Sequence, residues 1–272
     1  MALRLAVLAR GVGTPLPDAP TGGHVGLQRP VGRAWVSHER GIKRMSIHVL
    51  DNPAWHSLNG AHATLGQRSG GAGAYKRQVS VFGAVAEPGA LPELADLLEP
   101  GGIVGLALPE PIAEPDPRRW KEHRIVPVHQ MICDRLVARP VAEMVRLGEE
   151  NVEEMMALVK LTEPGPFAPR TIEMGNYWGV FEGGKLLAMA GERLRPKGWV
   201  ELSGVCTHPD GRGRGLAAAL CTRVLEGIFG KGAGSFLHVV VGGPSEHTAV
   251  GVYERLGFRH RRRMVVQILE RL

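Results

Sequence analysis

The sequence predicts a mixed α/β fold, in which helices pack against a central sheet. Two observations indicate it. Strand-like apolar segments and helices with one apolar face follow one another through residues 46–272. One strand also runs into a glycine- and arginine-rich turn that leads directly into an apolar helix, "THPDGRGRGLAAAL", from Thr207 to Leu220. At 272 residues the chain is long enough for two modest domains.

The first half, about residues 46–136, has the pattern of a small α/β unit. Residues 54–67 place Trp55, Leu58, His62 and Leu65 on one face of a predicted helix. The other expected elements are strands at 77–86, 101–108 and 123–133, the last broken by Pro127, and a short helix at 91–100.

The second half repeats this rhythm without an internal repeat of fixed period. An acidic-start helix is expected over 148–162, and a hairpin over 177–194 turns at Gly183 and Gly184. After it the sequence predicts a strand at 199–207, the helix after the glycine-rich turn, a strand at 235–241, a helix at 245–257 and a final strand at 263–269.

Residues 1–44 differ in composition from the rest. They hold seven basic and two acidic residues, a net charge of +5, which leaves only +1 for the remaining 228 residues. They show no sustained period and are expected to be disordered. A secretory signal is not indicated, an organellar transit peptide stays open, and a true translation start at Met45 is favoured because the patterned sequence begins there.

Charge and cysteine usage exclude several classes. The near-neutral body does not favour nonspecific phosphate binding, so nucleic acid is not an expected partner, and binding through the basic head is kept only as an alternative. The three cysteines are widely spaced and form no C-x-x-C pair, which indicates a reducing cytoplasm and no thiolate zinc site. Cys206 and Cys221 are interpreted as buried small hydrophobes rather than nucleophiles. No apolar run is long enough to span a membrane, and no metal site is expected.

The glycine-rich turn has the chemistry of an anion site. The first N–H groups of a helix lack intrahelical partners, the helix dipole adds positive charge, and glycine lets a ligand oxygen approach the backbone. No G-K-[ST] follows Gly215, so it is not a P-loop. A dinucleotide fingerprint from Gly213 to Ala218 lacks the later βα units it requires. The pattern [RQ]-x-x-G-x-[GA] is met by Arg212, Gly215 and Ala217.

At about residues 140–272 the chain resembles the GNAT superfamily of N-acetyltransferases. The resemblance rests on "VCTHPDGRGRGLAAAL" and "AVGVYERLGF", one strand apart, and on "MAGERL" before "ELSGVCTHP". It implies a mixed, mostly antiparallel sheet flanked by helices. It also implies a degenerate GNAT-like N-terminal half at 45–138 and a catalytic domain at 139–272, which follow the disordered basic extension expected at 1–44.

The resemblance implies acetyl-CoA as the co-substrate. Its pyrophosphate would be held by backbone N–H groups of Arg212, Gly213, Arg214, Gly215, Leu216 and Ala217. Its pantetheine arm would meet the unpaired backbone of Val205, Cys206 and Thr207, because the family's equivalent strand splays from its neighbour. His247 stands where the family has an Asn that contacts the cofactor arm, and His247 is the predicted cofactor contact at that position.

Two residues are predicted to carry the proton transfers. A protonated amine cannot attack a thioester, and Glu201 is the predicted base, with Glu192 as a second candidate and a structural ion pair as the alternative for Glu201. Strand alternation places Glu201, Val205 and Thr207 on one face. Tyr253 matches the family's acid tyrosine, with a packed core tyrosine as the alternative.

The predicted function is direct acetyl transfer from acetyl-CoA to a primary amine of a small molecule or peptide, in a ternary complex. A non-catalytic acyl-CoA sensor and nucleic-acid binding through the basic head are the alternatives. The sequence identifies neither the acceptor nor the acyl chain length, and it leaves a homodimer open.

Overall fold

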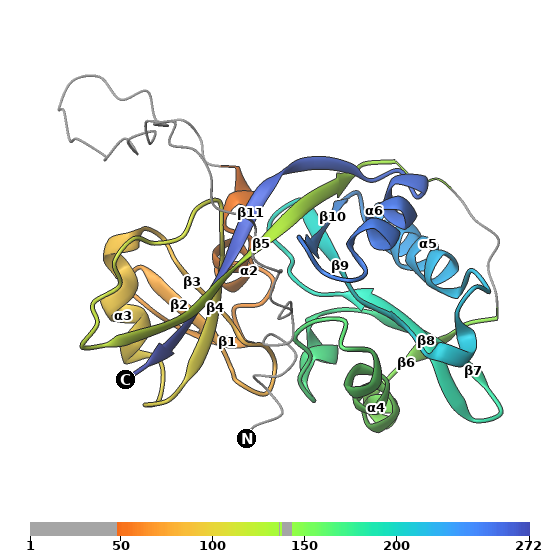
Figure 1. The fold of residues 1–272 in the computed structure, drawn as a ribbon, viewed down its shortest axis with the longest axis horizontal. Coiled ribbons are helices and arrows are strands. Elements are labelled where there is room, and N and C mark those ends of the chain that lie inside the picture. Colours follow the sequence, from red (N-terminus) through yellow and green to blue (C-terminus); the bar gives the residue numbers. More distant parts are fainter. Residues whose placement is uncertain (1–47, 136, 138–142) are drawn as a thin grey trace, which may run out of the picture.

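A computed structural model describes residues 48–135, 137 and 143–272 of the chain (Figure 1). The described strands form an eleven-stranded sheet in the order β1-β2-β3-β4-β11-β5-β10-β9-β8-β7-β6. Among them, β3 with β4 and β9 with β10 are the parallel pairs, and the others are antiparallel. The predicted mixed, mostly antiparallel sheet with flanking helices is therefore confirmed. The basic head and the predicted start at Met45 lie outside the described residues.

The first half contains short elements that precede one long strand. They are η1 (Val49–Asp51), α2 (Pro53–Leu58), β1 (Gly66–Ser69), β2 (Ala72–Tyr75), β3 (Phe82–Val85), η2 (Pro88–Ala90), α3 (Leu91–Asp96), β4 (Ile103–Leu108) and β5 (Trp120–Cys133).

Two expectations for this half are wrong in detail. The helix predicted over 54–67 ends at Leu58, and the β1–β2 hairpin, which turns at the left-handed Gly70, follows soon after it. His62 therefore lies on a loop, where it is buried and its ring nitrogens form hydrogen bonds with the Tyr75 hydroxyl and the Met174 carbonyl. Pro127 does not break β5, because its carbonyl still accepts from the Val241 N–H and β11 still pairs alongside it.

The second half follows the predicted order closely. Its elements are β6 (Val145–Leu147), η3 (Glu149–Asn151), α4 (Val152–Thr162), η4 (Thr171–Met174), β7 (Tyr177–Glu182), β8 (Lys185–Glu192), β9 (Trp199–Thr207), η5 (Pro209–Gly211), α5 (Leu216–Phe229), β10 (Gly234–Val240), α6 (Glu246–Arg255) and β11 (Arg259–Arg271). Gly183 and Gly184, both with positive φ, turn the β7–β8 hairpin as expected.

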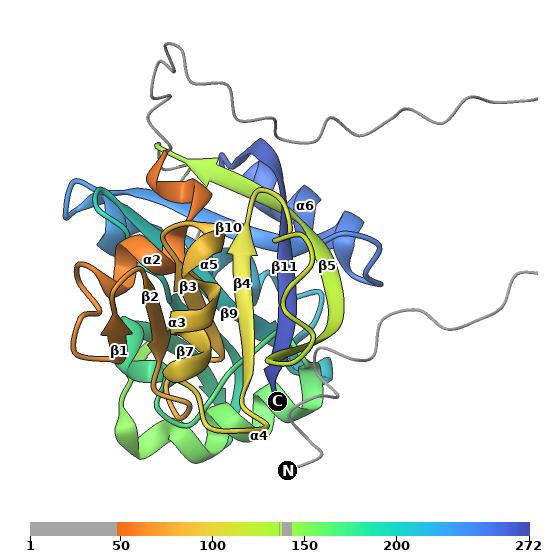
Figure 2. The same ribbon diagram turned by 90° about the vertical axis from the view of Figure 1, so that its left-hand side faces the viewer.

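The two halves share one sheet. β11 pairs with β5 along its length, and from Val265 to Glu270 it also pairs with β4, so the last strand of the chain lies inside the sheet of the first half (Figure 2). The predicted domain boundary between residues 138 and 139 lies outside the described residues.

The helices cover opposite faces of the second half of the sheet. Leu220 and Val224 of α5 and the partly buried Tyr253 of α6 pack into one cluster with Leu202 of β9. Met155 and Leu158 of α4 pack on the other face, with Tyr177 and Cys206. The side chains of β9 therefore contribute to two different clusters, one under α5 and α6 and one under α4.

Candidate active site

A fork between two parallel strands forms the centre of the site. β9 and β10 pair only from Gly234 to Phe236, against Trp199 to Glu201. No further pair joins them within the described residues, although β9 continues to Thr207 and β10 to Val240. The backbone of β9 beyond Glu201 is thus free on the side toward β10, including the predicted contacts Val205, Cys206 and Thr207. An extended polar ligand can hydrogen-bond there as an added strand would.

A β-bulge in β9 lies at the fork. Against β8, Gly191 pairs with Ser203 and Met189 with Cys206, so β9 holds one extra residue, and Gly204 has φ +63°. The expectation that Val205 shares a face with Glu201 is therefore wrong. Val205 packs with the α5 face, whereas Glu201 binds Arg193 over Phe82 on the opposite face.

The glycine-rich turn leaves the N-terminus of α5 open. Gly213 and Gly215 both have φ +75°, and a Cβ at either position would meet no atom within 4 Å. Leu216 is buried and anchors the first turn of the helix. The α5 N-cap has no side-chain hydrogen bond. The N–H groups of this turn and the space in front of them fit a pyrophosphate.

The two arginines of the turn add charge without filling this space. Arg212 and Arg214 are exposed, and Arg214 forms a 2.6 Å ion pair with Glu182, which is also exposed. An exposed pair of this kind is weak, so an anionic ligand can compete for Arg214.

Tyr253 lies on the α5 face of the fork. Its ring packs edge-on against Phe258, with ring centroids 5.7 Å apart, and the residue is half-buried. Within the described part of the chain its hydroxyl has no hydrogen-bond partner. Burial raises the pKa of this phenol, and the thiols of Cys221 and Cys206 raise it further. The hydroxyl is therefore a protonated donor at neutral pH.

Glu201 is fully buried and accepts four hydrogen bonds. Arg193 donates from Nε and from Nη2, both at 2.8 Å, His238 Nδ1 lies 2.8 Å away, and the Leu194 N–H donates at 3.3 Å. Burial alone raises the pKa of this carboxyl, but Arg193 and then His238 outweigh it, so the net pKa is below the ordinary value. The ion pair that the sequence left as an alternative is present.

The network around Glu201 determines the tautomer of His238. Gln130 Nε2 donates to the Leu50 carbonyl at 2.8 Å and lies 3.1 Å from His238 Nε2, while Gln130 Oε1 accepts from Arg261. The amide therefore donates to Nε2 of the imidazole, and Nδ1 carries the proton that Glu201 accepts. His238 has no free nitrogen.

The remaining predicted residues lie at the edges of the site. Glu192 is buried at the end of β8, where Arg195 and the Asn176 amide donate to its carboxylate. His247 is exposed in the first turn of α6, and its contact to a cofactor arm stays a prediction. Burial raises the pKa of the Cys206 and Cys221 thiols to about 12, consistent with inert packed cysteines.

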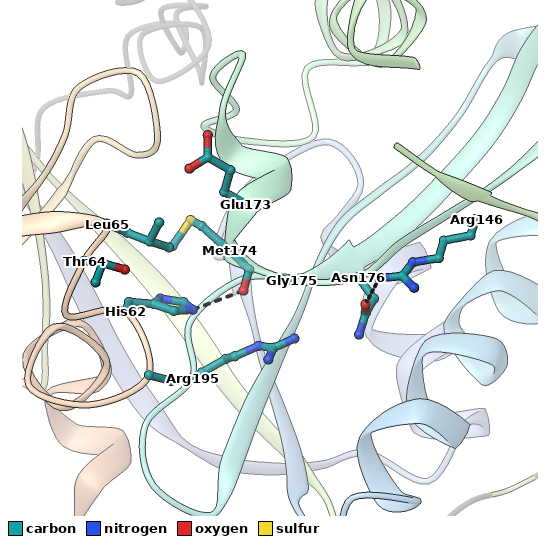
Figure 3. Close-up of a pocket in the computed structure, with 10 residues that line it drawn as sticks. His62, Thr64, Leu65, Arg146, Glu173, Met174, Gly175, Asn176 and Arg195 are labelled. Atoms are coloured by element: carbon teal, nitrogen blue, oxygen red, sulfur yellow. Dashed lines mark hydrogen bonds between the residues drawn. The ribbon is translucent and has the colours of Figure 1, made fainter. Parts of the chain in front are cut away.

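Sequence reasoning missed a polar pocket between the halves (Figure 3). It has a volume of about 340 Å³ and is lined by His62, Thr64 and Leu65 from the first half and by Arg146, Glu173, Met174, Gly175, Asn176 and Arg195 from the second. In the sheet, β8 lies between β7, which borders this pocket, and β9, which borders the fork. Residues far apart in the sequence build it, so no local pattern marks it.

Comparisons with known proteins agree with this geometry. A family model described as FR47-like protein matches residues 177–266, from β7 into β11. A protein of known structure from Novosphingobium aromaticivorans DSM 12444, assigned as an acetyltransferase of the GNAT family, is 41% identical. The match covers 83% of this chain and 100% of that chain, with a TM-score of 0.76. The chain belongs to the GNAT family.

More distant GNAT structures share the fold at 17% identity. A GCN5-related N-acetyltransferase from Kribbella flavida matches over 80% of this chain and 95% of its own, with a TM-score of 0.52. A GCN5-related N-acetyltransferase-like protein from Streptococcus suis 89/1591 matches over 81% and 92%, with a TM-score of 0.53. No curated protein matches the chain.

None of the described helices is long and apolar enough to cross a membrane. Within the same residues, no group of three or more His, Cys, Asp or Glu side chains is placed to hold a metal ion.

Proposed function

We propose that this GNAT-family protein transfers an acetyl group from acetyl-CoA to a primary amine of a small molecule or peptide, by direct attack in a ternary complex. One observation carries the proposal: the β9–β10 fork leads directly into the open N-terminus of α5. The anion site at the α5 N-terminus, the free backbone edge of β9 and the half-buried phenol of Tyr253 thus follow one another.

The two ends of the donor have separate binding groups on this path. The Arg212 N–H already donates to the Pro209 carbonyl at 3.2 Å, so the backbone N–H groups from Gly213 to Ala217 are the ones that hold the pyrophosphate, and the Arg212 side chain adds charge. The free edge of β9 from Val205 to Thr207 pairs with the amides of the pantetheine arm. The thioester then lies near the bulge at Gly204, with Tyr253 on the α5 side.

Tyr253 is the proposed acid for the leaving thiolate. The attacking amine forms a bond to the carbonyl carbon, the carbon–sulfur bond breaks, and the departing sulfur takes the electron pair. A phenol donates to a thiolate because it stays protonated at neutral pH, and burial strengthens this preference in Tyr253. Its otherwise unpaired hydroxyl is consistent with this role.

Glu201 is retained as the proposed base, with one condition. All four of its acceptor positions are occupied, so the amine or a relaying water must displace one donor before the carboxylate accepts a proton. Glu192 faces the same requirement. This saturation is also the observation that favours the second candidate, an acyl-CoA sensor without chemistry.

An amine panel distinguishes the two candidates. The full chain is incubated with acetyl-CoA and a set of primary amines and amino-terminal peptides, and release of free CoA thiol is followed. The proposal expects steady release with at least one amine, abolished in Gly215→Val. Tight CoA binding without transfer to any amine would favour the sensor. A cytoplasmic location and a homodimer remain proposals beside it.

A further inference from the structure

Tyr177 carries a buried hydroxyl that no described residue satisfies. The residue is 1% exposed, and its hydroxyl oxygen has no hydrogen-bond partner within residues 48–135, 137 and 143–272. Leaving a buried hydroxyl unpaired destabilises a folded protein, so such groups call for an explanation. The second buried tyrosine of this region, Tyr75, has its hydroxyl 2.9 Å from His62 Nδ1.

Packing holds the Tyr177 ring over β8 and the bulge of β9. A Cβ on Gly191 would lie 2.3 Å from the ring, and a Cβ on Gly204 would lie 2.9 Å from the ring and 3.6 Å from the hydroxyl oxygen. Phe167 packs edge-on against the same ring, with centroids 5.6 Å apart. The hydroxyl is therefore placed directly beside Gly204, at the fork.

The polar neighbours that could satisfy this hydroxyl are engaged elsewhere. Arg193 and Glu201 hold each other in a two-bond pair, and Glu192 is held by Arg195 and Asn176. Burial, the largest influence, raises the pKa of the Tyr177 phenol, so it stays a donor. Gly204 and its two sequence neighbours are half-buried, so the strand beside the hydroxyl is within reach of a ligand in the fork.

We propose that the Tyr177 hydroxyl donates a hydrogen bond to the acetyl carbonyl oxygen of the bound thioester. This inference rests on the proposed function, because it needs the acyl group to lie at the bulge. The partner of the hydroxyl arrives with the acyl group and not with CoA itself. When the amine attacks, the electron pair of the carbonyl π bond moves onto that oxygen, and the same donor then faces a growing negative charge.

The test compares acetyl-CoA with CoA in binding, so it needs no acceptor. Calorimetry on the full chain measures both dissociation constants for the wild type, Tyr177→Phe and Tyr75→Phe. For Tyr177→Phe we expect acetyl-CoA to bind about three- to tenfold more weakly and CoA to bind unchanged. The melting temperature should stay the same or rise, because an unpaired buried hydroxyl has been removed.

Tyr75→Phe is the matched control, since it removes a paired buried hydroxyl. We expect it to lower the melting temperature and leave the ratio of the two dissociation constants unchanged. An unchanged ratio in Tyr177→Phe would overturn the inference, whatever its melting temperature. A wild-type protein that binds neither CoA nor acetyl-CoA would instead overturn the proposed function, and the inference with it.

Discussion

Replacing Arg193 by Met should strongly destabilise the protein. The guanidinium donates two of the four hydrogen bonds to Glu201, whose side chain is 0% exposed, and its own side chain is only 12% exposed. Met keeps the length of the side chain and its packing over Phe82 but removes the charge. Glu201 would then keep its burial and lose its main counter-charge.

The expected loss follows from this burial. Removing one partner of a buried pair typically costs about 3–5 kcal/mol, because the other charge stays uncompensated. The double variant Arg193→Met with Glu201→Gln should recover part of that loss, since no buried charge remains. Arg118→Met is the surface control: its pair with Asp116 is exposed, and the unfolding midpoint should not change.

The dependence on pH has a definite sign. In the wild-type fold the pKa of Glu201 is lowered below its unfolded value of about 4.3. The ion pair with Arg193 therefore stabilises the fold fully above that unfolded pKa, and this stabilisation is lost only as pH falls through the folded pKa. Without Arg193, burial raises the pKa of Glu201, so the variant gains stability as pH falls. The difference in the free energy of unfolding between the wild type and Arg193→Met should therefore narrow from pH 7 to pH 4.

Urea unfolding at both pH values measures these differences. A loss below about 1 kcal/mol at pH 7 would refute the reasoning, because a pair of that strength behaves like an exposed one. A difference in unfolding free energy that stays the same from pH 7 to pH 4 would also refute the reasoning, since the titration of Glu201 would then not contribute to it.

Three further predictions concern the donor site and helix α6. Gly215→Val should abolish CoA binding by calorimetry and lower stability by about 1–3 kcal/mol, because φ is +75° there although the space is open; unchanged affinity would refute the pyrophosphate assignment. Tyr253→Phe should lower kcat about a hundredfold with little change in the acetyl-CoA Kd or the melting temperature, and a wild-type kcat would return Tyr253 to the core. Glu246→Ala should speed amide hydrogen exchange in α6, because the Glu246 carboxylate bonds His129 and the Gly242 N–H, and no described residue of α6 is fully buried. Unchanged exchange would show that these two contacts do not stabilise the helix.

The sequence by itself determined the features that depend on neighbours along the chain. The glycine–arginine turn and the apolar face of the helix after it are local, because missing N–H partners, positive φ and helical periodicity act within a few residues. The Gly183–Gly184 hairpin and the order of elements after residue 148 were predicted for the same reason. The Tyr253 motif was also found locally, although its role stays a prediction.

Tertiary structure alone decided the pairing of groups that are far apart in sequence. The bulge at Gly204 places Val205 on the α5 face of the sheet, opposite to Glu201. This bulge arises from the pairing of β9 with β8, so β9 alone does not reveal it. The sequence left open whether Glu201 is a free base or part of an ion pair, and only the fold brings it to its partners, His238, 37 residues later, and Arg193, which directly follows β8. The insertion of β11 beside β4 followed from no local pattern either. Hydrogen-bond pairing and burial are satisfied by whichever groups the fold brings together, so a one-dimensional pattern can propose these groups but cannot assign their partners.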